Sequence, residues 1–382
     1  MKILLLDAAF GALPIFEALA RGGHEVWVMG NRPNDVLAQK AGPRWINEDY
    51  SKIDNVRAHL ACQRFDRIVP GCTDTSIDVC ARLEQTTYLL DPPATNLTLS
   101  NKAAFRHLCN ELGLSAPRLV EREKFPLAGQ FICKPVDAFS GNGVTVFDGS
   151  NLESLKSAYA AALRASQGGG VLIESFTAGE LYSCSAFIER QKVVNSFYVR
   201  EGSSANPFAV DTSYVVDDLP IECQRQLISD IEAICLALSL RDGLLHTQFI
   251  LDRDNHPSII EIARRCPGDL YSLLIEYSTG YPYAAKYASY FIGDSLDARA
   301  GERRHVLRHT VTSGKDTGVF TGLQLKDPIP VRAYFPINAL GHHLLPNQGS
   351  RAGILFSEAP ASDRLADLYR HFVERQTYGV IS

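Results

Sequence analysis

Two features are missing from this sequence of 382 residues, and each excludes a class of partner. There is no basic excess, because 38 lysines and arginines face 43 acidic residues and the net charge is −5. Proteins that bind nucleic acid by neutralising phosphates usually carry a clustered basic excess, so no nucleic-acid partner is expected. No apolar run approaches the roughly 18 to 20 residues needed to cross a bilayer, so no membrane partner is expected either.

The nine cysteines lack any C-x-x-C spacing and are odd in number, which favours neither a disulfide framework nor a zinc cluster. The N-terminus, MKILLLDAAF, is a short apolar run without the small-residue cleavage site of a signal peptide. We therefore expect a cytoplasmic protein with reduced core cysteines.

Along the first hundred residues, short apolar runs alternate with helical patterns, which favours a parallel, doubly wound sheet. Strands are expected at 2–7, 25–29 and 66–70, and helices near 13–20 and 74–83. The first loop lacks a G-x-G-x-x-G fingerprint, so a dinucleotide is not expected there. Ligands of such sheets lie beyond the carboxyl ends of the strands, so Asp7 and the loop 70–76 are candidate co-substrate contacts. For Thr73 and Asp74, a helix N-cap is at least as good an interpretation.

A double proline, Pro92 and Pro93, predicts a domain boundary. Beyond it, apolar periodicity predicts strands between 115 and 200, short strands from about 300 onward, and further helices at 101–113, 151–166, 220–239, 269–278, 281–292 and 363–374.

The most informative stretch is residues 244–265, in which the turn DRDNHP separates two apolar runs and predicts an antiparallel hairpin. Side chains alternate along a strand, so His246 and Gln248 share one face of the first strand. By the same alternation, Glu261, Ala263 and Arg265 share one face of the second. If these faces coincide, oxygen ligands and a guanidinium converge, which suits a magnesium ion and phosphate. The alternative is a buried ion pair between Glu261 and Arg265, with Gln248 hydrogen-bonded beside it.

Two upstream segments carry related chemistry. In residues 131–147, Lys134 ends an apolar strand and is followed by the loop SGNG, whose glycines let backbone amides approach a phosphate. An ordinary turn explains this loop equally simply. Lys134 on a buried strand weighs against that interpretation, because an unpaired lysine is rarely buried. In residues 171–188, Glu174 ends a second apolar strand and Glu180 begins another, a connection that can face an adenine ring and ribose.

In this order the segments resemble the ATP-grasp superfamily, through NKAAFRHLCNELGLSAPR (101–118), the Lys134 strand with its loop, ESFTAGE, HTQFIL and EIARRCPGD. The resemblance implies an α/β fold with the α+β grasp architecture in three parts. These are an N-terminal Rossmann-like parallel-sheet domain (1–95), a two-lobed ATP-grasp domain (96–298, lid lobe about 120–180) and a small C-terminal α+β module (299–382).

The resemblance also implies roles for single residues. The positions that match ATP contacts are Lys102, Lys134, Ser140, Gly141, Gly143, Glu174, Ser175, Phe176, Thr177 and Glu180. The magnesium-ligand positions are Gln248 and Glu261, and the catalytic positions are Arg265 and Lys134. The candidate substrate contacts are His246, Arg264 and Asp74.

Two positions depart from the family pattern. Gln248 stands where the family often has glutamate, and Ala263 stands where it commonly has asparagine. An amide keeps an oxygen ligand but removes a negative charge, so a second magnesium ion is expected to be held weakly or mainly by ATP.

The resemblance implies an ATP-dependent carboxylate-amine ligase. It would form an amide or peptide bond through an acyl phosphate, release ADP and phosphate, and act on amino acids or a related small metabolite. The expected cofactors are ATP and Mg²⁺, with Mn²⁺ as a substitute. The expected partners are small-molecule carboxylate and amine substrates, with a homodimer left open. The alternatives are a non-catalytic ATP-binding regulatory protein, or an ATP-grasp enzyme of the purine or carboxylase type.

Overall fold

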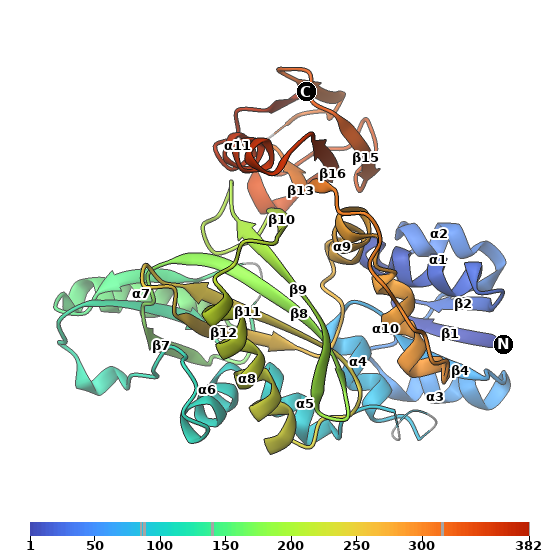
Figure 1. Cartoon of the computed structure of the whole chain (residues 1–382), viewed down its shortest axis with the longest axis horizontal. Helices are drawn as coiled ribbons and strands as arrows, with labels where there is room; N and C mark the ends of the chain where they lie inside the picture. Colours follow the sequence, from blue (N-terminus) through green and yellow to red (C-terminus); the bar gives the residue numbers. More distant parts are fainter. Residues whose placement is uncertain (85, 87–88, 139–140, 315–316, 382) are drawn as a thin grey trace.

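The computed structural model describes residues 1–84, 86, 89–138, 141–314 and 317–381. Its N-terminal part confirms the expected parallel sheet, with strand order β3-β2-β1-β4 (Figure 1). The elements are β1 (Lys2–Leu6), α1 (Leu13–Arg21), β2 (Glu25–Met29), α2 (Val36–Ala41), β3 (Trp45–Ile46), α3 (Ile53–Cys62), β4 (Arg67–Pro70) and α4 (Asp74–Ala81).

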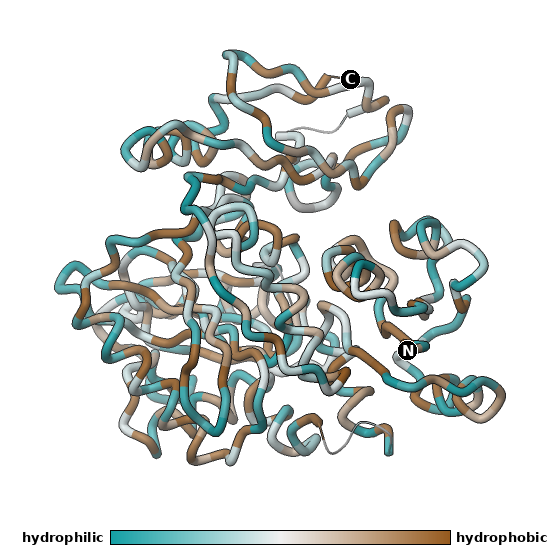
Figure 2. Tube along the Cα trace, turned by 45° about the vertical axis from the view of Figure 1, so that its right-hand side comes forward, coloured by the Kyte–Doolittle hydropathy of each residue, from teal (hydrophilic) through white to brown (hydrophobic). Residues whose placement is uncertain are grey.

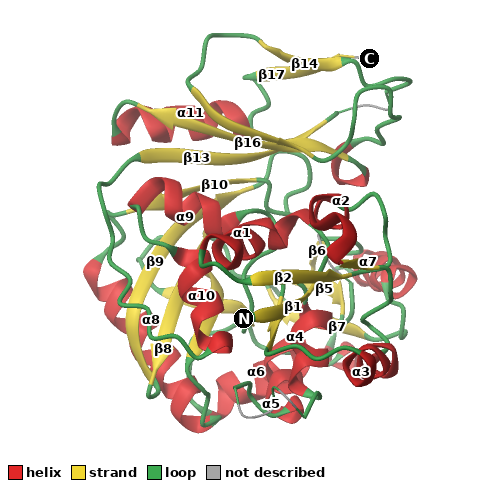
Figure 3. Ribbon diagram, turned by 90° about the vertical axis from the view of Figure 1, so that its right-hand side faces the viewer, coloured by secondary structure: helices red, strands yellow, loops and turns green. Residues whose placement is uncertain are grey.

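This parallel sheet is completed by distant residues. Helices α9 (Tyr271–Thr279) and α10 (Tyr283–Ile292) belong to the same apolar core as the strands, and Figure 3 shows α10 beside α1. The approach is close at Gly11, where a Cβ atom would lie 2.5 Å from the carbonyl oxygen of Gly268. The N-terminal layer is therefore packed firmly against the chain that follows the central hairpin.

A small lobe follows helices α5 (Pro93–Ser100) and α6 (Lys102–Glu111). It is an antiparallel sheet of order β6-β5-β7, and α7 lies beside it at the left of Figure 1. Its elements are β5 (Gln130–Pro135), β6 (Thr145–Asp148), α7 (Leu152–Ala165) and β7 (Val171–Ser175). Phenylalanines from β5 and β6 pack against alanines of α7, which gives this lobe an apolar core of its own.

The largest sheet has eight strands in the order β12-β11-β8-β9-β10-β13-β16-β15. Its strands are β8 (Glu180–Glu189), β9 (Lys192–Gly202), β10 (Thr212–Val216), β11 (Gly243–Leu251), β12 (Pro257–Ala263), β13 (His305–Thr312), β15 (Val331–Pro336) and β16 (Arg351–Ala359). Helix α8 (Ile221–Ala237) contributes to the core on one face. The remaining elements are α11 (Ser362–Val373) and the two-stranded sheet of β14 (Gly322–Leu325) and β17 (Tyr378–Ile381).

The C-terminal residues therefore extend the central sheet through β13, β16 and β15. The hydropathy trace in Figure 2 shows hydrophobic residues along many interior strands and hydrophilic residues at outer turns. All eight helices expected from the sequence are present with ends within two residues of expectation, and α2, α3 and α5 are additional. The limits 1–95, 96–298 and 299–382 remain predictions.

None of the helices in the described part of the chain is both long and apolar enough to cross a bilayer. All nine cysteines are free thiols, and eight are buried.

A buried polar chain ties β10 to the last strand. Oγ1 of Thr212 lies 2.8 Å from Nδ1 of His309, and Nε2 of His309 lies 2.9 Å from the Tyr378 hydroxyl. Burial lowers the pKa of His309 to about 3, so the ring is neutral in the folded protein.

We expect His309 to make the fold acid-sensitive. Because its folded pKa of about 3 lies below the ordinary 6.5, the unfolded chain binds an additional proton between these values. Stability present above the ordinary pKa is therefore lost as the pH falls through this window. The Tm of His309→Gln should fall less steeply than that of the wild type between about pH 7 and about pH 4. His256→Gln, at an exposed turn, should keep the wild-type slope, and equal slopes in all three proteins would contradict the prediction.

Candidate active site

A buried carboxylate joins two cations at the end of β7. Glu174 Oε2 lies 2.5 Å from Lys134 Nζ, and Glu174 Oε1 lies 2.9 Å from Arg106 Nε. Lys134 keeps only 13% of its side chain exposed, and burial lowers its pKa, although the carboxylate opposes that shift. The buried charge of Lys134 therefore has a partner, the carboxylate of Glu174.

Arg106 connects this ion pair to the central sheet. The guanidinium is buried, and its NH2 group donates a 2.5 Å hydrogen bond to the carbonyl oxygen of Ile260 on β12, next to Glu261. Lys102 begins the same helix and is close enough for its charge to lower the pKa of Lys134. The sequence prediction missed Arg106, although a charged residue beside Phe105 and Leu108 on the buried side of a helix was a usable signal.

The glycine loop lies close to the loop between β9 and β10 of the large sheet. Ser140 lies outside the described residues, whereas Gly141 and Gly143 have φ angles of +69° and +73°, a region that favours glycine. A Cβ atom at Gly141 would lie 2.7 Å from Cβ of Phe208. The loop bearing Phe208 is fastened by Asp211, which accepts hydrogen bonds from the backbone and hydroxyl of Ser204. Gly141 therefore lies against the loop that joins β9 and β10.

The linker after β7 is partly occupied by structural contacts. The amide of Ser175 donates to Arg118 O (2.9 Å), and the amide of Phe176 donates to Gln130 O (3.1 Å). Phe176 is 39% exposed, so an apolar ring is available to a ligand. Thr177 follows it on the exposed part of the linker, where the resemblance places the adenine.

Glu180, at the position that the resemblance assigns to ribose, is paired. Its Oε1 accepts a short hydrogen bond from Arg200, and its Oε2 accepts one of 3.2 Å from the Tyr182 hydroxyl. The Arg200 guanidinium also lies over the ring of Tyr369 of α11. The C-terminal part of the chain therefore helps to shape this end of the site.

The hairpin has the register that the magnesium interpretation requires. Gln248 lies directly opposite Glu261, and His246 lies opposite Ala263, with a bulge after Gln248. An amide oxygen and a carboxylate therefore lie side by side, while Ala263 offers no ligand. The Nε2 atom of Gln248 donates a 2.6 Å hydrogen bond to Glu201 Oε2.

A polar row crosses this face of the central sheet. Gln248 is paired in register with Ser183, and Ser213 is paired with both Glu201 and Arg308. Burial raises the pKa of Glu201 to about 7, opposed by hydrogen bonds from Ser183 and Gln248.

The far end of the row is a buried ion pair. Arg308 is fully buried and pairs at 2.5 Å with Asp269, from the loop after β12. It also donates a 2.9 Å hydrogen bond to the Ser213 hydroxyl. Sequence reasoning missed Glu201, Asp269 and Arg308, of which only Asp269 lay within a quoted motif.

Arg265 lies beyond the end of β12 and reaches the N-terminal layer. Its Nε and NH2 groups donate to the two carboxylate oxygens of Asp74 at 2.7 and 2.9 Å. The expected alternative, an ion pair between Glu261 and Arg265, is therefore not the arrangement found, although Glu261 is near enough to act on the charge of Arg265. Thr73 is the N-cap of α4, as one interpretation held, and accepts a hydrogen bond from the Ser76 amide.

The other two candidate substrate contacts are, like Asp74, engaged by the protein itself. Arg264 donates to Asp91, to the Leu244 carbonyl and to the Arg241 carbonyl at 2.6 to 2.8 Å, and its side chain is buried. His246 is buried, its Nδ1 lies 2.9 Å from the Ser185 hydroxyl, and burial lowers its pKa to about 3. It can act only as a neutral hydrogen-bonding group at physiological pH.

Asp7, the other candidate of the N-terminal layer, also has a structural role. Its carboxylate accepts hydrogen bonds of 2.9 Å from the amides of Ala9 and Cys72, which joins the loops after β1 and β4.

The oxygen donors of the hairpin fit magnesium. Gln248 and Glu261 would supply one amide and one carboxylate oxygen, and hard cations usually complete their shell with water and substrate phosphates. Another group, Asp252, Asp254 and His256, brings possible ligand atoms within 4.8 Å of one another at the hairpin tip. Asp252 there accepts hydrogen bonds from the turn amides, so a turn contact explains that group.

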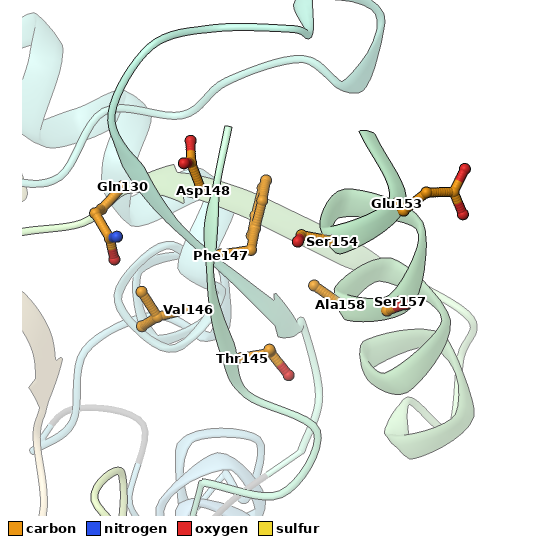
Figure 4. A pocket seen from close by; sticks show the side chains of 9 residues that line it. All are labelled: Gln130, Thr145, Val146, Phe147, Asp148, Glu153, Ser154, Ser157 and Ala158. Carbon is orange, nitrogen blue, oxygen red and sulfur yellow. The ribbon is translucent and has the colours of Figure 1, made fainter. Parts of the chain in front are cut away.

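The hollow in Figure 4 lies in the small lobe, between β6 and α7. It is lined by Gln130, Thr145, Val146, Phe147, Asp148, Glu153, Ser154, Ser157 and Ala158, none of them a candidate site residue.

Solved structures share the architecture of the whole chain. The L-amino acid ligase from Bacillus licheniformis matches with a TM-score of 0.79 and 18% identity, over 100% of this chain and 98% of that one. Phosphoribosylglycinamide synthetase from Anaerococcus prevotii matches with a TM-score of 0.76 and 17% identity, over 100% and 99%. The biotin carboxylase domain of the Hydrogenobacter thermophilus 2-oxoglutarate carboxylase, solved with MgADP, ADP and bicarbonate, matches with 0.75 and 13%, over 100% and 90%.

No protein-family model and no curated protein matches the sequence. At identities of 13 to 18% the likeness is one of fold, and it confirms the ATP-grasp architecture that the motifs predict.

Proposed function

We propose that this chain, which has the ATP-grasp fold, is an ATP-dependent ligase that joins a carboxylate to an amine through an acyl phosphate. The observation that carries the proposal is the convergence of distant segments around the hairpin of β11 and β12. Gln248 lies opposite Glu261, and Glu261 is near enough to act on the charge of Arg265. Arg106 links the hairpin to Glu174 and Lys134 of the small lobe.

In the proposed reaction, a carboxylate oxygen attacks the γ-phosphorus of ATP, and the bond to the bridging oxygen of ADP breaks. The amine nitrogen then attacks the acyl carbon, phosphate leaves and the amine loses a proton. Lys102 and Lys134 would hold phosphate oxygens, and Arg265 would stabilise charge on the transferred group. A magnesium ion on Gln248 and Glu261 would offset the charge of the triphosphate.

Amino acids are the substrates that we favour, and the L-amino acid ligase in the comparison supports this choice. A cytoplasmic location and a homodimer remain expectations.

Product analysis tests the proposed reaction. The protein is incubated with ATP, Mg²⁺ and pooled amino acids, and ADP, AMP, phosphate and pyrophosphate are measured. Substrate-dependent ADP and phosphate would support a ligase, whereas AMP and pyrophosphate would indicate adenylate chemistry. Nucleotide binding without turnover across a wide panel of acids and amines would favour the regulatory function, for which Gln248 and Ala263 are the grounds.

We expect Glu261→Gln to raise the Mg²⁺ concentration required for half-maximal activity about tenfold or more, because it removes the carboxylate from the ligand pair. A Mg²⁺ titration of ADP release would measure the change. Asp254→Asn neutralises an exposed carboxylate of the same hairpin and should leave the titration unchanged. An unaltered Mg²⁺ requirement in Glu261→Gln would remove this residue from the site.

A further inference from the structure

The Gln248 amide is held by Glu201. The 2.6 Å hydrogen bond runs from Nε2 of Gln248 to Oε2 of Glu201, on the strand two places along the sheet from β11. Glu201 Oε2 is the acceptor of this bond, so the NH₂ group of the amide is the group that faces the carboxylate. The amide oxygen is then left for a ligand on the side of Glu261, which lies opposite Gln248 on β12.

Glu201 is itself fixed from several sides. Its carboxylate accepts a hydrogen bond from Ser183, and Ser213 lies opposite it on β10. Its carbonyl oxygen accepts a 3.1 Å hydrogen bond from the Tyr369 hydroxyl of α11. At the next residue, a Cβ atom on Gly202 would lie 2.2 Å from the same hydroxyl, so strand and helix are in close contact. The carboxylate is therefore held in one place before any ligand binds.

Some buried carboxylates of this chain contact groups away from the candidate residues. Glu276, for example, is largely buried and accepts a 2.9 Å hydrogen bond from the Ala284 amide at the start of α10. Glu201 differs because its side chain contacts the one residue of the proposed ligand pair that lacks a charge.

We propose that Glu201 is a positioning residue for the magnesium site, an inference that rests on the proposed function. Its carboxylate orients the Gln248 amide with the oxygen toward Glu261 and supplies, from β9, the negative charge that position 248 lacks. The negative charge is thereby supplied from β9, two strands along the sheet from β11, in place of position 248.

A charge-exchange experiment tests this. The proteins are wild type, Glu201→Gln, Gln248→Glu, the double variant Glu201→Gln/Gln248→Glu, and Glu276→Gln as the matched control for neutralising a buried carboxylate. Binding of Mn²⁺ at fixed ADP is measured by electron paramagnetic resonance under the same conditions for all five proteins. This readout does not require turnover.

We expect Glu201→Gln to weaken Mn²⁺ binding about tenfold or more, as is usual when a partner of a metal ligand is lost. Gln248→Glu alone should also weaken binding, because two carboxylates would then face each other at hydrogen-bond distance. The double variant restores one carboxylate and one amide in exchanged places and should recover affinity to within about threefold of the wild type. Glu276→Gln should bind as the wild type does.

Wild-type affinity in Glu201→Gln, or a double variant as weak as the two losses combined, would overturn the inference and leave the proposed function standing. Failure of the wild type to bind Mn²⁺ with ADP would overturn both. If Glu201→Gln does not fold, as judged by circular dichroism, Glu201→Asp replaces it, because the shorter side chain keeps the charge but withdraws it from the amide. That variant should also bind Mn²⁺ more weakly, and wild-type affinity would again overturn the inference.

Discussion

Replacing Arg265 with alanine is expected to lower kcat about 10²- to 10³-fold while changing the apparent KM for ATP far less. The bidentate contact with Asp74 holds the guanidinium in place before substrate arrives, so its charge is available when negative charge develops on the transferred phosphate. Arg265→Lys keeps a charge but loses the fork geometry, and an intermediate kcat is expected.

Steady-state kinetics with the substrate pair found by product analysis would measure both constants. Arg303→Ala is the matched control, because Arg303 also donates to an aspartate, Asp217, at 2.7 Å but lies outside the site. If KM for ATP rose as much as kcat fell, Arg265 would be a ground-state phosphate contact and its assigned role would be wrong.

The second large effect is expected in Glu174→Gln. This change keeps the shape of the side chain but leaves Lys134 and Arg106 as buried cations without their counter-charge. Breaking a buried pair in this way costs about 3–5 kcal/mol of the free energy of unfolding. Nucleotide affinity should fall as well, because Lys134 loses the partner that positions it.

Urea unfolding and calorimetric titration with ADP would measure the two effects. Glu180→Gln is the same chemical change on the same linker, at a side chain that is 54% exposed and paired with Arg200. Its cost should stay below about 1 kcal/mol, as for most surface ion pairs. Equal losses in both variants would mean that the Glu174 cluster contributes no more than a surface pair.

The hairpin shows how far local pattern carries a prediction. Alternation along two apolar runs and a short turn were enough to place Gln248 beside Glu261, because turn length and buried faces together fix the register of a hairpin. The bulge after Gln248 was not predictable, since an inserted residue leaves the apolar pattern almost unchanged.

The partners of the charged residues were out of reach of sequence reasoning. Arg265 meets Asp74 across 191 residues of chain. The Arg106 contact with Ile260 spans 154 residues. The adjacent residues Arg264 and Arg265 show this limit of sequence-based prediction. Both were candidates for ligand binding, but Arg264 donates its hydrogen bonds to Asp91 and two carbonyl groups. Only tertiary packing decides which of two neighbouring guanidinium groups is turned inward.

The C-terminal part was expected to be a small α+β module, and it does contain both strands and a helix, α11. The sequence could not reveal that β13 would pair with β10, because Thr212 and His309 lie 97 residues apart and neither strand carries a signal for its neighbour. Tyr369 and its contact with Glu201 were hidden for the same reason.

The pairing of β13 with β10 has a practical consequence for anyone shortening this protein. A polypeptide ending at residue 298 would keep every magnesium, lysine and linker position, yet β10 would be left with a row of unsatisfied amides and carbonyls along one side. An exposed edge strand of this kind can pair with a strand of another molecule. Such a truncation is expected to precipitate or self-associate, because the last eighty residues cover an edge of the central sheet that could otherwise pair with another molecule.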